Sequence, residues 1–296
     1  MTNDETEPLV ERYAAPRSIE EAVRLVAEGG ATVLAGGTDL MPQVRAGTRD
    51  LGRALVNIRR IAGLDRIEFA DGRFRVGALV TVTGVLESPD LAERARVLVD
   101  AADCFASNQI RNAATLGGNI CNASPAGDMI VPLMLLDAEV ELATWAEGGV
   151  RTRRLPLDGF FDGPGRTRRR SAEILTYIHF QAPGPDHVAR FRKFGPRPAL
   201  EIATVSVGIA GDRRGGALGN ARVVFGAVAP TPLRGRRTEA AIEGRALDDA
   251  TIAAACEAAE TEVRPISDVR ASAWYRRHLV GALTREILTD VADYGD

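Results

Sequence analysis

The sequence predicts an α+β protein in two units, and three observations support this class. Mixed helix and strand patterns run to about residue 165. A stretch rich in glycine and arginine, "FDGPGRTRRRSAE", follows over 161–173 and is typical of a linker. Beyond it, several strand-like segments precede two helical ones, which is the order expected of an α+β unit. We therefore expect one domain over 1–172 and a smaller one over 173–296.

The first unit begins with a helix followed by a strand. Ser18 and Glu21 form a capping box ahead of apolar residues at helical spacing, and Gly29-Gly30 end the pattern. The apolar run Ala31–Ala35 then predicts a strand, and "ALVNIRRI" from residue 54 predicts another.

Two hairpins and further helices complete this unit. Alternating residues on both sides of Asp71-Gly72 predict the first hairpin, and "EVELATWAEGGVRTRRL" over 139–155 predicts the second. Ser88 and Pro89 suit the start of a helix that continues over 90–106. The apolar stretch Ile130–Leu136 predicts a buried helix.

The second unit combines strands with two long helical segments. Strands are expected in "EILTYIHF", "FRKF", "EIATVSVGIAG" and "ARVVFGAVA", and the first helix has Asp248 as its N-cap. In the last helical segment, 267–291, the apolar residues Trp274, Leu279, Leu283 and Ile287 predict core packing or a partner interface, and residues 275–277 are expected at the surface.

The composition is that of an ordinary globular protein and excludes several classes of function. Of 296 residues, 45% are hydrophobic and 26% charged, and a net charge of -3 gives no reason to expect a nucleic-acid partner. No apolar run reaches membrane-spanning length, and the acidic start "MTNDETEPLVERY" is unlike a secretory signal, so we expect a cytoplasmic protein.

The cysteines and histidines exclude a metal centre held by this chain alone. Cys104, Cys121 and Cys256 lie far apart without CxxC spacing, and the three histidines show no ligand spacing. We therefore expect no metal site and no iron–sulfur cluster here. Redox chemistry in this protein would depend on an organic cofactor.

Two glycine-containing stretches indicate a ligand site. In "VLAGGTDLMPQVRAG", over 33–47, an apolar strand stops at two glycines; "NAATLGGNICNASPAGDMIVPLMLLDA", over 112–138, places Gly117-Gly118 at the end of a helix and follows them with small polar residues. Glycines permit close approach to the main chain, and free amides bind anions. The two stretches could clamp a diphosphate, with Asn119, Ser124 or Asp128 reaching ligand oxygens. The alternative is two tight turns, because neither stretch is a GxGxxG or Walker sequence.

The same two stretches resemble a known family. "LAGGTDLMPQVRAG" and "IRNAATLGGNICNASPAGD" are similar to the two FAD-binding signatures of the flavoprotein (medium) subunit of molybdenum hydroxylases, such as carbon monoxide and xanthine dehydrogenases. "KFGPRPALEIATVSVG" and "DVRASAWYRRHLVGALTREIL" resemble the family's C-terminal domain, so the resemblance covers nearly the whole chain.

The resemblance implies a fold, a cofactor and an assembly. The fold is a two-subdomain FAD-binding domain of the vanillyl-alcohol-oxidase (PCMH) type, followed by a smaller α+β domain. FAD would be bound non-covalently, since no histidine lies in either motif. A small partner would carry two [2Fe-2S] clusters and a large partner the molybdenum–pterin cofactor, in a dimer of heterotrimers. Electrons would pass from the clusters through FAD to an outside acceptor.

The resemblance also implies which residues contact FAD. Phe105 corresponds to a residue near the flavin, although helix-end packing explains it equally well, and Leu175 and Lys193 correspond to contacts from the C-terminal side. Asp128 corresponds to a ribose-binding aspartate. The diphosphate loops correspond to Leu34, Ala35, Gly36, Gly37, Thr38, Asp39 and Leu40, and to Ala114, Thr115, Gly117, Gly118 and Asn119. Asp39 suits a helix cap better than a catalytic acid.

Three functions remain open at this point. The first is an electron-transfer subunit with no catalytic acid or base of its own. The second is a self-sufficient FAD-dependent oxidase of the same fold, and the third is a scaffold that has lost FAD. The sequence identifies neither the hydroxylated substrate nor the electron acceptor. The cluster Arg166–Arg170 is a solvated linker or a docking site for an acidic partner or nucleotide.

Overall fold

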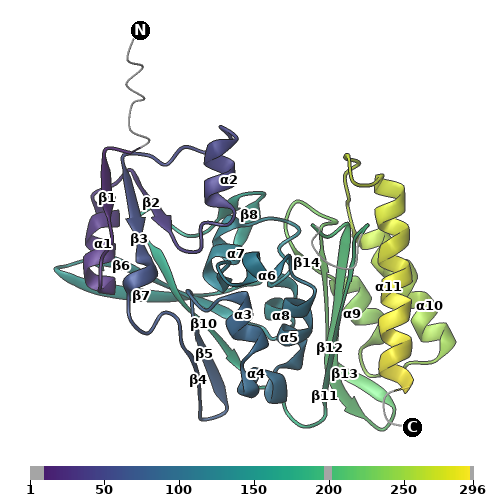
Figure 1. Cartoon of the computed structure of the whole chain (residues 1–296). Coiled ribbons are helices and arrows are strands. Elements are labelled where there is room, and N and C mark those ends of the chain that lie inside the picture. Colours follow the sequence, from purple (N-terminus) through teal and green to yellow (C-terminus); the bar gives the residue numbers. More distant parts are fainter. Residues whose placement is uncertain (1–9, 197–201, 294–296) are drawn as a thin grey trace.

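The protein forms two units that pack side by side, as seen in a computed structural model that describes residues 10–196 and 202–293 (Figure 1). The N-terminal unit contains two main sheets, a two-stranded hairpin and short helices. The C-terminal unit is an antiparallel sheet with helices on its outer face. This architecture confirms the predicted α+β class, with two subdomains in the larger unit.

The first subdomain is a small parallel sheet. Its strands are β1 (Arg12–Ala14), β3 (Ala54–Asn57) and β2 (Ala31–Leu34), in that order across the sheet. Helix α1 (Ile19–Ala27) connects β1 to β2 and begins at Ser18, whose hydroxyl accepts the Glu21 amide as predicted. Two short elements follow the strands, α2 (Leu40–Arg45) after β2 and the 3-10 helix η1 (Ile58–Arg60) after β3.

The second subdomain is a five-stranded antiparallel sheet with helices on one face. The strands, in spatial order, are β4 (Ile67–Ala70), β5 (Arg73–Gly77), β10 (Ile174–Gln181), β6 (Glu139–Ala146) and β7 (Gly149–Pro156). The helices are α3 (Val82–Leu86), α4 (Pro89–Arg94), α5 (Arg96–Asp103), α6 (Asn108–Arg111), α7 (Leu116–Asn122) and α8 (Ile130–Leu135). The largest hydrophobic core lies between this sheet and these helices.

Local sequence signals predicted both hairpins and two helix starts. The β4–β5 turn has Asp71 and Gly72 at positive φ, and the β6–β7 turn has Glu147 and Gly148 there, as a type I′ turn requires. Ser88 caps α4. The single helix expected over 90–106 is wrong, because the chain leaves helical geometry at Ala95 and continues as α5.

The expected linker and domain boundary are also wrong. Residues 161–173 include an ordered hairpin of β8 (Phe161–Gly163) and β9 (Arg166–Thr167). The next strand, β10, pairs with both β5 and β6 and so lies in the centre of the N-terminal sheet. A boundary after residue 172 would remove this central strand, and we place the boundary at 182–186, between β10 and the following strand.

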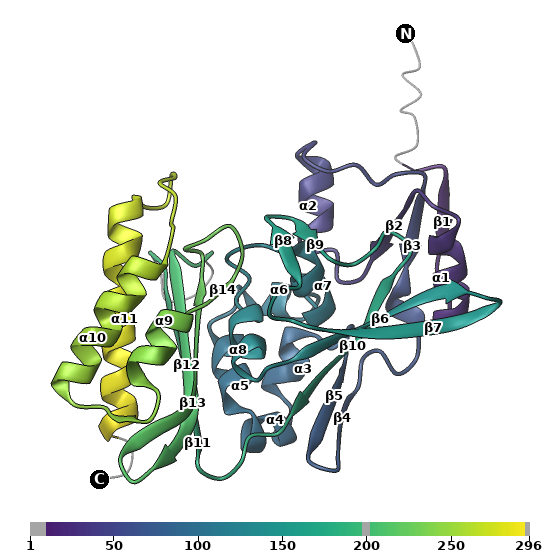
Figure 2. The ribbon, with the colours of Figure 1, turned by 180° about the vertical axis from the view of Figure 1, so that it is seen from behind.

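The C-terminal unit is a sheet covered by helices on its outer face. Its main strands are β11 (His187–Phe194), β12 (Val205–Arg214) and β13 (Ala217–Gly226), with the short β14 (Leu233–Arg234) and β15 (Arg245–Ala246) paired to β13. The helices are α9 (Arg236–Ile242), α10 (Asp249–Glu262), capped by Asp248 as predicted, and α11 (Ala273–Asp293). The inner face of the sheet meets α5 and α8, as the view from behind shows (Figure 2).

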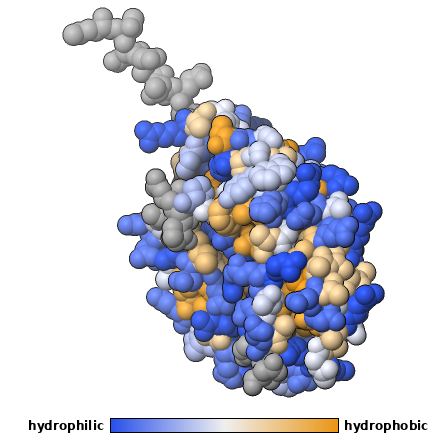
Figure 3. Space-filling model, turned by 90° about the vertical axis from the view of Figure 1, so that its right-hand side faces the viewer, coloured by the Kyte–Doolittle hydropathy of each residue, from blue (hydrophilic) through white to orange (hydrophobic). Residues whose placement is uncertain are grey.

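Helix α11 departs from expectation at its first turn. Leu279, Leu283 and Ile287 join the C-terminal core, but Trp274 is 69% exposed and lies outside it. Arg276, expected at the surface, is 3% exposed and donates to Asp268 and to the carbonyls of Thr204 and Ala227. Hydrophilic and hydrophobic residues are interspersed on this side of the molecule (Figure 3).

Two sequence-based expectations, a C-terminal motif and the lack of a membrane-spanning segment, can be compared only with the described ranges. Residues 197–201 of the motif "KFGPRPALEIATVSVG" lie outside the described residues. Within the described ranges, no helix is long and apolar enough to cross a membrane.

Candidate functional site

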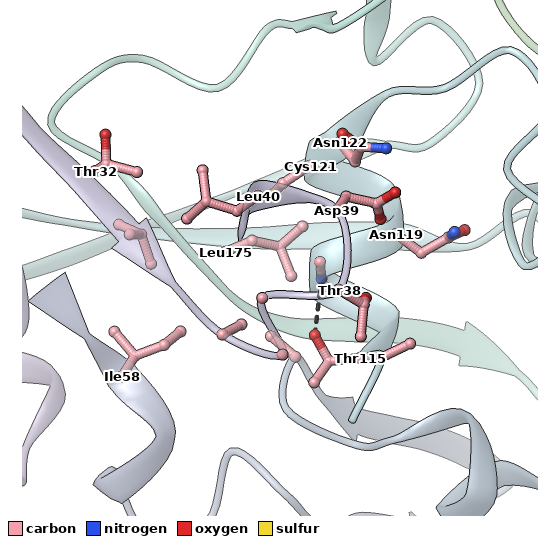
Figure 4. Close-up of a pocket in the computed structure, with 18 of the residues that line it drawn as sticks. Thr32, Thr38, Asp39, Leu40, Ile58, Thr115, Asn119, Cys121, Asn122 and Leu175 are labelled. Carbon is pink, nitrogen blue, oxygen red and sulfur yellow. Dashed lines mark hydrogen bonds between the residues drawn. The ribbon is translucent and has the colours of Figure 1, made fainter. Parts of the chain in front are cut away.

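A cavity opens between the two predicted glycine loops, and it is walled on a third side by the segment that leads into β10. It is lined by residues from β2 and the loop after it, from η1, from α7, and from 169–175 (Figure 4). Most of the predicted site residues line it; Leu34, Ser124, Asp128 and Lys193 do not. The structure therefore brings together segments that are about 140 residues apart in the chain.

The first loop offers unused backbone donors. It connects β2 to α2, and within the described ranges the amides of residues 36–39 donate to no carbonyl or side chain. Gly37 has φ +76, a conformation that favours glycine. Unengaged amides gathered in a loop form an anion-binding concavity. These four residues line the cavity, so its wall offers donors to an anionic ligand.

Gly36 allows the two loops to come into contact. A Cβ built on Gly36 would lie 2.1 Å from the carbonyl oxygen of Ala113. Ala113 and Ala114 belong to the second loop, ahead of α7. A side chain at residue 36 would therefore push the loops apart.

The second loop is already hydrogen-bonded internally. The amides of Leu116 and Gly117 donate to Val80 and Ala78, and the Gly118 amide donates to the Thr115 hydroxyl (dashed line, Figure 4). Gly117 and Gly118 thus lie in the first turn of α7, which corrects the expectation that they end a helix. A Cβ on Gly117 would lie 2.6 Å from that of Ala78. The lack of a side chain at Gly117 therefore allows α7 to pack closely against the residue that follows β5.

The polar side chains of the cavity include two asparagines and one aspartate. Asn119 Oδ1 is buried and has no hydrogen-bond partner in the described ranges, and Asn122 accepts from Gln43 of α2 at 2.9 Å. Asp39 occupies the N-cap position of α2, as expected, yet its side chain makes no capping hydrogen bond. Desolvation raises the pKa of Asp39 above its ordinary value.

Phe105 lines the cavity on a loop that Arg111 holds in place. The Arg111 guanidinium donates to the carbonyl oxygens of Asp103, Phe105 and Ala106. Ala106 has positive φ (34°), which is uncommon for a residue with a side chain. These bonds fix Phe105 at the cavity wall.

Asp128 and Lys193 form a buried ion pair beside the cavity rather than lining it. Lys193 Nζ lies 2.6 Å from Asp128 Oδ2 and 3.0 Å from the carbonyl oxygen of Cys104, and both side chains are over nine-tenths buried. Burial raises the pKa of Asp128 from 3.8 to about 6, against the opposing pull of Lys193. Asp128 Oδ1 has no partner in the described ranges. The ribose and flavin contacts implied for this pair stay predictions.

Two arginines in the cavity lining were not among the predicted site residues. They are Arg49, after α2, and Arg169, in the arginine cluster left open by the sequence. Arg169 Nη1 donates to the carbonyl oxygens of Arg170 and Glu173, at 3.1 and 2.6 Å. The sequence signal for Arg169 was the arginine cluster 166–170, but the sequence does not distinguish the arginine that lines the cavity from its neighbours.

The lining of this cavity contains no histidine. None of the three histidines is among its lining residues, and the described residues contain no group of three or more metal-ligating side chains. Cys121 lines the cavity, and burial raises the pKa of its thiol, which disfavours the nucleophilic thiolate. The lining thus suits a non-covalently held organic anion.

Comparison with known proteins identifies the family. Residues 7–182 match the family model of the FAD binding domain in molybdopterin dehydrogenase, and residues 190–291 match that of the CO dehydrogenase flavoprotein C-terminal domain. The chain belongs to the molybdenum hydroxylase family, as a medium, FAD-binding subunit. The end of the first match at residue 182 agrees with the place of β10 in the N-terminal sheet.

Individual relatives agree with this assignment over almost the whole chain. The chain is 34% identical over 282 residues to a putative xanthine dehydrogenase FAD-binding subunit of Escherichia coli, and the match covers 94% of each chain. It is 29% identical to the carbon monoxide dehydrogenase medium chain of Hydrogenophaga pseudoflava, covering 93% of this chain and 95% of the relative. A solved structure of carbon monoxide dehydrogenase from that organism superposes with a TM-score of 0.89 at 29% identity, over 95% of this chain and 96% of the other.

Proposed function

We propose that this chain is the electron-transfer subunit of a heterotrimeric molybdenum hydroxylase. In this proposal a small partner supplies electrons from [2Fe-2S] clusters, a large partner hydroxylates the substrate at a molybdenum–pterin cofactor, and an external acceptor is reduced. The names of the relatives, which are medium chains and FAD-binding subunits of dehydrogenases, support it. A cytoplasmic location and a dimer of heterotrimers remain part of the proposal.

The observation that carries the proposal is the set of unengaged amides at residues 36–39. These donors fit a diphosphate, because amides aimed at phosphate oxygens need no side-chain charge. Gly36 keeps this loop against Ala113, and Thr115 holds the first turn of α7 opposite it. Bound FAD supplies a redox centre between one-electron donors and an external acceptor.

The remaining lining residues bind and shape the cavity rather than convert a substrate. Glu173 is held by two hydrogen bonds from Arg153, at 2.6 and 2.9 Å. That leaves Asp39 as the cavity carboxylate without a partner in the described ranges, and no histidine lines the cavity. A self-sufficient oxidase would need a positioned base, and this lining gives weak support for one.

The test is a visible absorption spectrum of the purified chain, alone and after addition of FAD. We expect flavin bands near a 1:1 ratio and complete release of the chromophore by acid. Mixed with its partners, the chain then transfers electrons from reduced clusters to an acceptor, whereas alone it oxidises no organic substrate. Rapid substrate oxidation by the isolated chain would refute the electron-transfer assignment.

A variant connects the flavin to the amide loop. Gly37→Val introduces a β-branched side chain at φ +76, so the loop cannot keep its present backbone without strain of about 1–3 kcal/mol. We expect loss of FAD binding with an unchanged far-ultraviolet circular dichroism spectrum. A variant that retains stoichiometric flavin would show that this loop does not hold the diphosphate.

A further inference from the structure

The cavity has two chemically different ends. Its polar end is the amide loop 36–39 with Asn119, and its other end is formed by apolar side chains from β2, η1 and β10. In Figure 4, Thr32 and Ile58 lie on the opposite side of the cavity from Asp39 and Asn119. The residues of this end, called the apolar end below, are Ala31, Val33, Ile58, Ile174 and Leu175, together with the polar Thr32. A flat, uncharged ring system suits such an end.

Arg49 and Arg169 bring positive charge to the cavity lining. Both residues are among those that line it. In the described ranges neither forms an ion pair with a carboxylate, in contrast with Arg168 beside them, which pairs with Asp162 at 3.2 Å. Two guanidinium groups without counter-charges facing one cavity favour an anionic or aromatic ligand.

The Arg169 side chain is held in place by the backbone around it. Its Nη1 bonds the carbonyl oxygens of Arg170 and Glu173, while Arg153 and the Arg170 amide hold the Glu173 carboxylate. Nε and Nη2 of Arg169 have no partner in the described ranges. Glu173, whose carbonyl oxygen accepts from Arg169, directly precedes Ile174 and Leu175, so the guanidinium is anchored next to two apolar lining residues.

We propose that Arg49 and Arg169 bind the AMP half of FAD and make the site select FAD over FMN. This inference rests on the proposed function, because it takes FAD as the ligand. The base occupies the apolar end under the Arg169 guanidinium, and Arg49 faces the adjoining phosphate. FMN lacks the AMP half, so its binding by the amide loop does not depend on either arginine.

The test measures dissociation constants for FAD and FMN by quenching of flavin fluorescence. We expect Arg169→Gln and Arg49→Gln each to weaken FAD binding by about tenfold, which is typical for loss of one guanidinium contact, and to leave FMN binding within about twofold. The matched control is Arg168→Gln, which removes the same charge from the neighbouring residue outside the cavity lining. It leaves both constants unchanged.

The outcomes separate this inference from the proposed function. If the wild type binds neither FAD nor FMN, the proposed function fails. If the wild type binds FAD and both variants match Arg168→Gln, or if FMN binding falls as much as FAD binding, the inference is overturned and the function stands. Thermal unfolding of the flavin-free variants shows whether Arg169→Gln disturbs the turn at 170–173; Arg49→Gln, on an exposed residue, tests the inference independently.

Discussion

Replacement of Gly36 by alanine tests whether contact between the two loops builds the cofactor site. The added Cβ would lie 2.1 Å from the Ala113 carbonyl oxygen and 2.9 Å from its carbonyl carbon. Real Cβ atoms essentially never come closer than 3.0 Å to such atoms. Because the obstacle is backbone and not the end of a flexible side chain, the loops must separate by about 1 Å.

This displacement has consequences for stability and for binding. Forcing backbone apart in a packed region costs roughly 1–3 kcal/mol. The amides of residues 36–39 move with Gly36, so the donors no longer match the phosphate positions. Misplacement of this size costs at least one charge-assisted hydrogen bond, about 1.5–3 kcal/mol, which corresponds to a loss of affinity of roughly 10- to 100-fold.

The assay combines FAD titration with urea unfolding of the flavin-free protein. The matched control is Gly149→Ala at the start of β7, where a Cβ would meet no atom within 4 Å and φ is not positive. We expect this control to match the wild type in FAD affinity, with stability equal or slightly higher because alanine restricts the unfolded chain. If Gly36→Ala binds FAD within twofold of the control, the loop contact does not build the site.

Three further predictions concern buried charges. Lys193→Met leaves the buried Asp128 carboxylate without its partner, and we expect a loss of about 3–5 kcal/mol in urea unfolding at pH 7, with a smaller loss at pH 5, where Asp128 is protonated. Since burial raises the pKa of Asp128 from 3.8 to about 6, the Asp128 carboxyl loses its proton at a lower pH in the unfolded state than in the folded state. The free energy of unfolding of the flavin-free wild type should therefore fall between about pH 4 and pH 6, by on the order of 3 kcal/mol, and an unchanged profile in Asp128→Asn would contradict this. Arg153→Ala removes both hydrogen bonds to Glu173, which is 1% exposed, and we expect a loss of about 3 kcal/mol at pH 7. Burial raises the pKa of Glu173, but the hydrogen bonds and charges of Arg153 and Arg170 together outweigh it and hold the pKa below 4.5. This contribution is therefore present above that pH and disappears on acidification; a variant as stable as the wild type at pH 7 would show that the pair contributes nothing.

The features predictable from sequence were those determined by neighbouring residues. Ser18, Ser88 and Asp248 cap helices with their own side chains, and Asp71-Gly72 turns a hairpin through its own dihedral angles. The two glycine loops were also recognised, and the structure brings them together. The assignment of each loop residue to a cofactor contact stays a prediction.

The features missed depend on partners far away in the chain. Whether β10 belongs to the first or the second unit depends on its pairing with β5, at least 100 residues earlier in the chain, which the apolar pattern of β10 does not encode. Arg276 was expected at the surface because arginine is usually exposed, but it is buried and donates to the carbonyl oxygens of Thr204 and Ala227, which flank β12 and β13 far from it in sequence. Arg169 likewise differs from Arg168 only in what the folded chain places beside it.

The buried pair connects the C-terminal unit to one wall of the cavity. Lys193 comes from β11 of the C-terminal sheet, and Asp128 from the turn before α8 in the N-terminal unit. Lys193 also donates to the carbonyl oxygen of Cys104, which directly precedes the cavity residue Phe105. A single ammonium group thus connects the C-terminal sheet to the loop that carries one wall of the cavity. Because a buried charge without its partner is costly on either side, this pair holds the two units together beside the cavity.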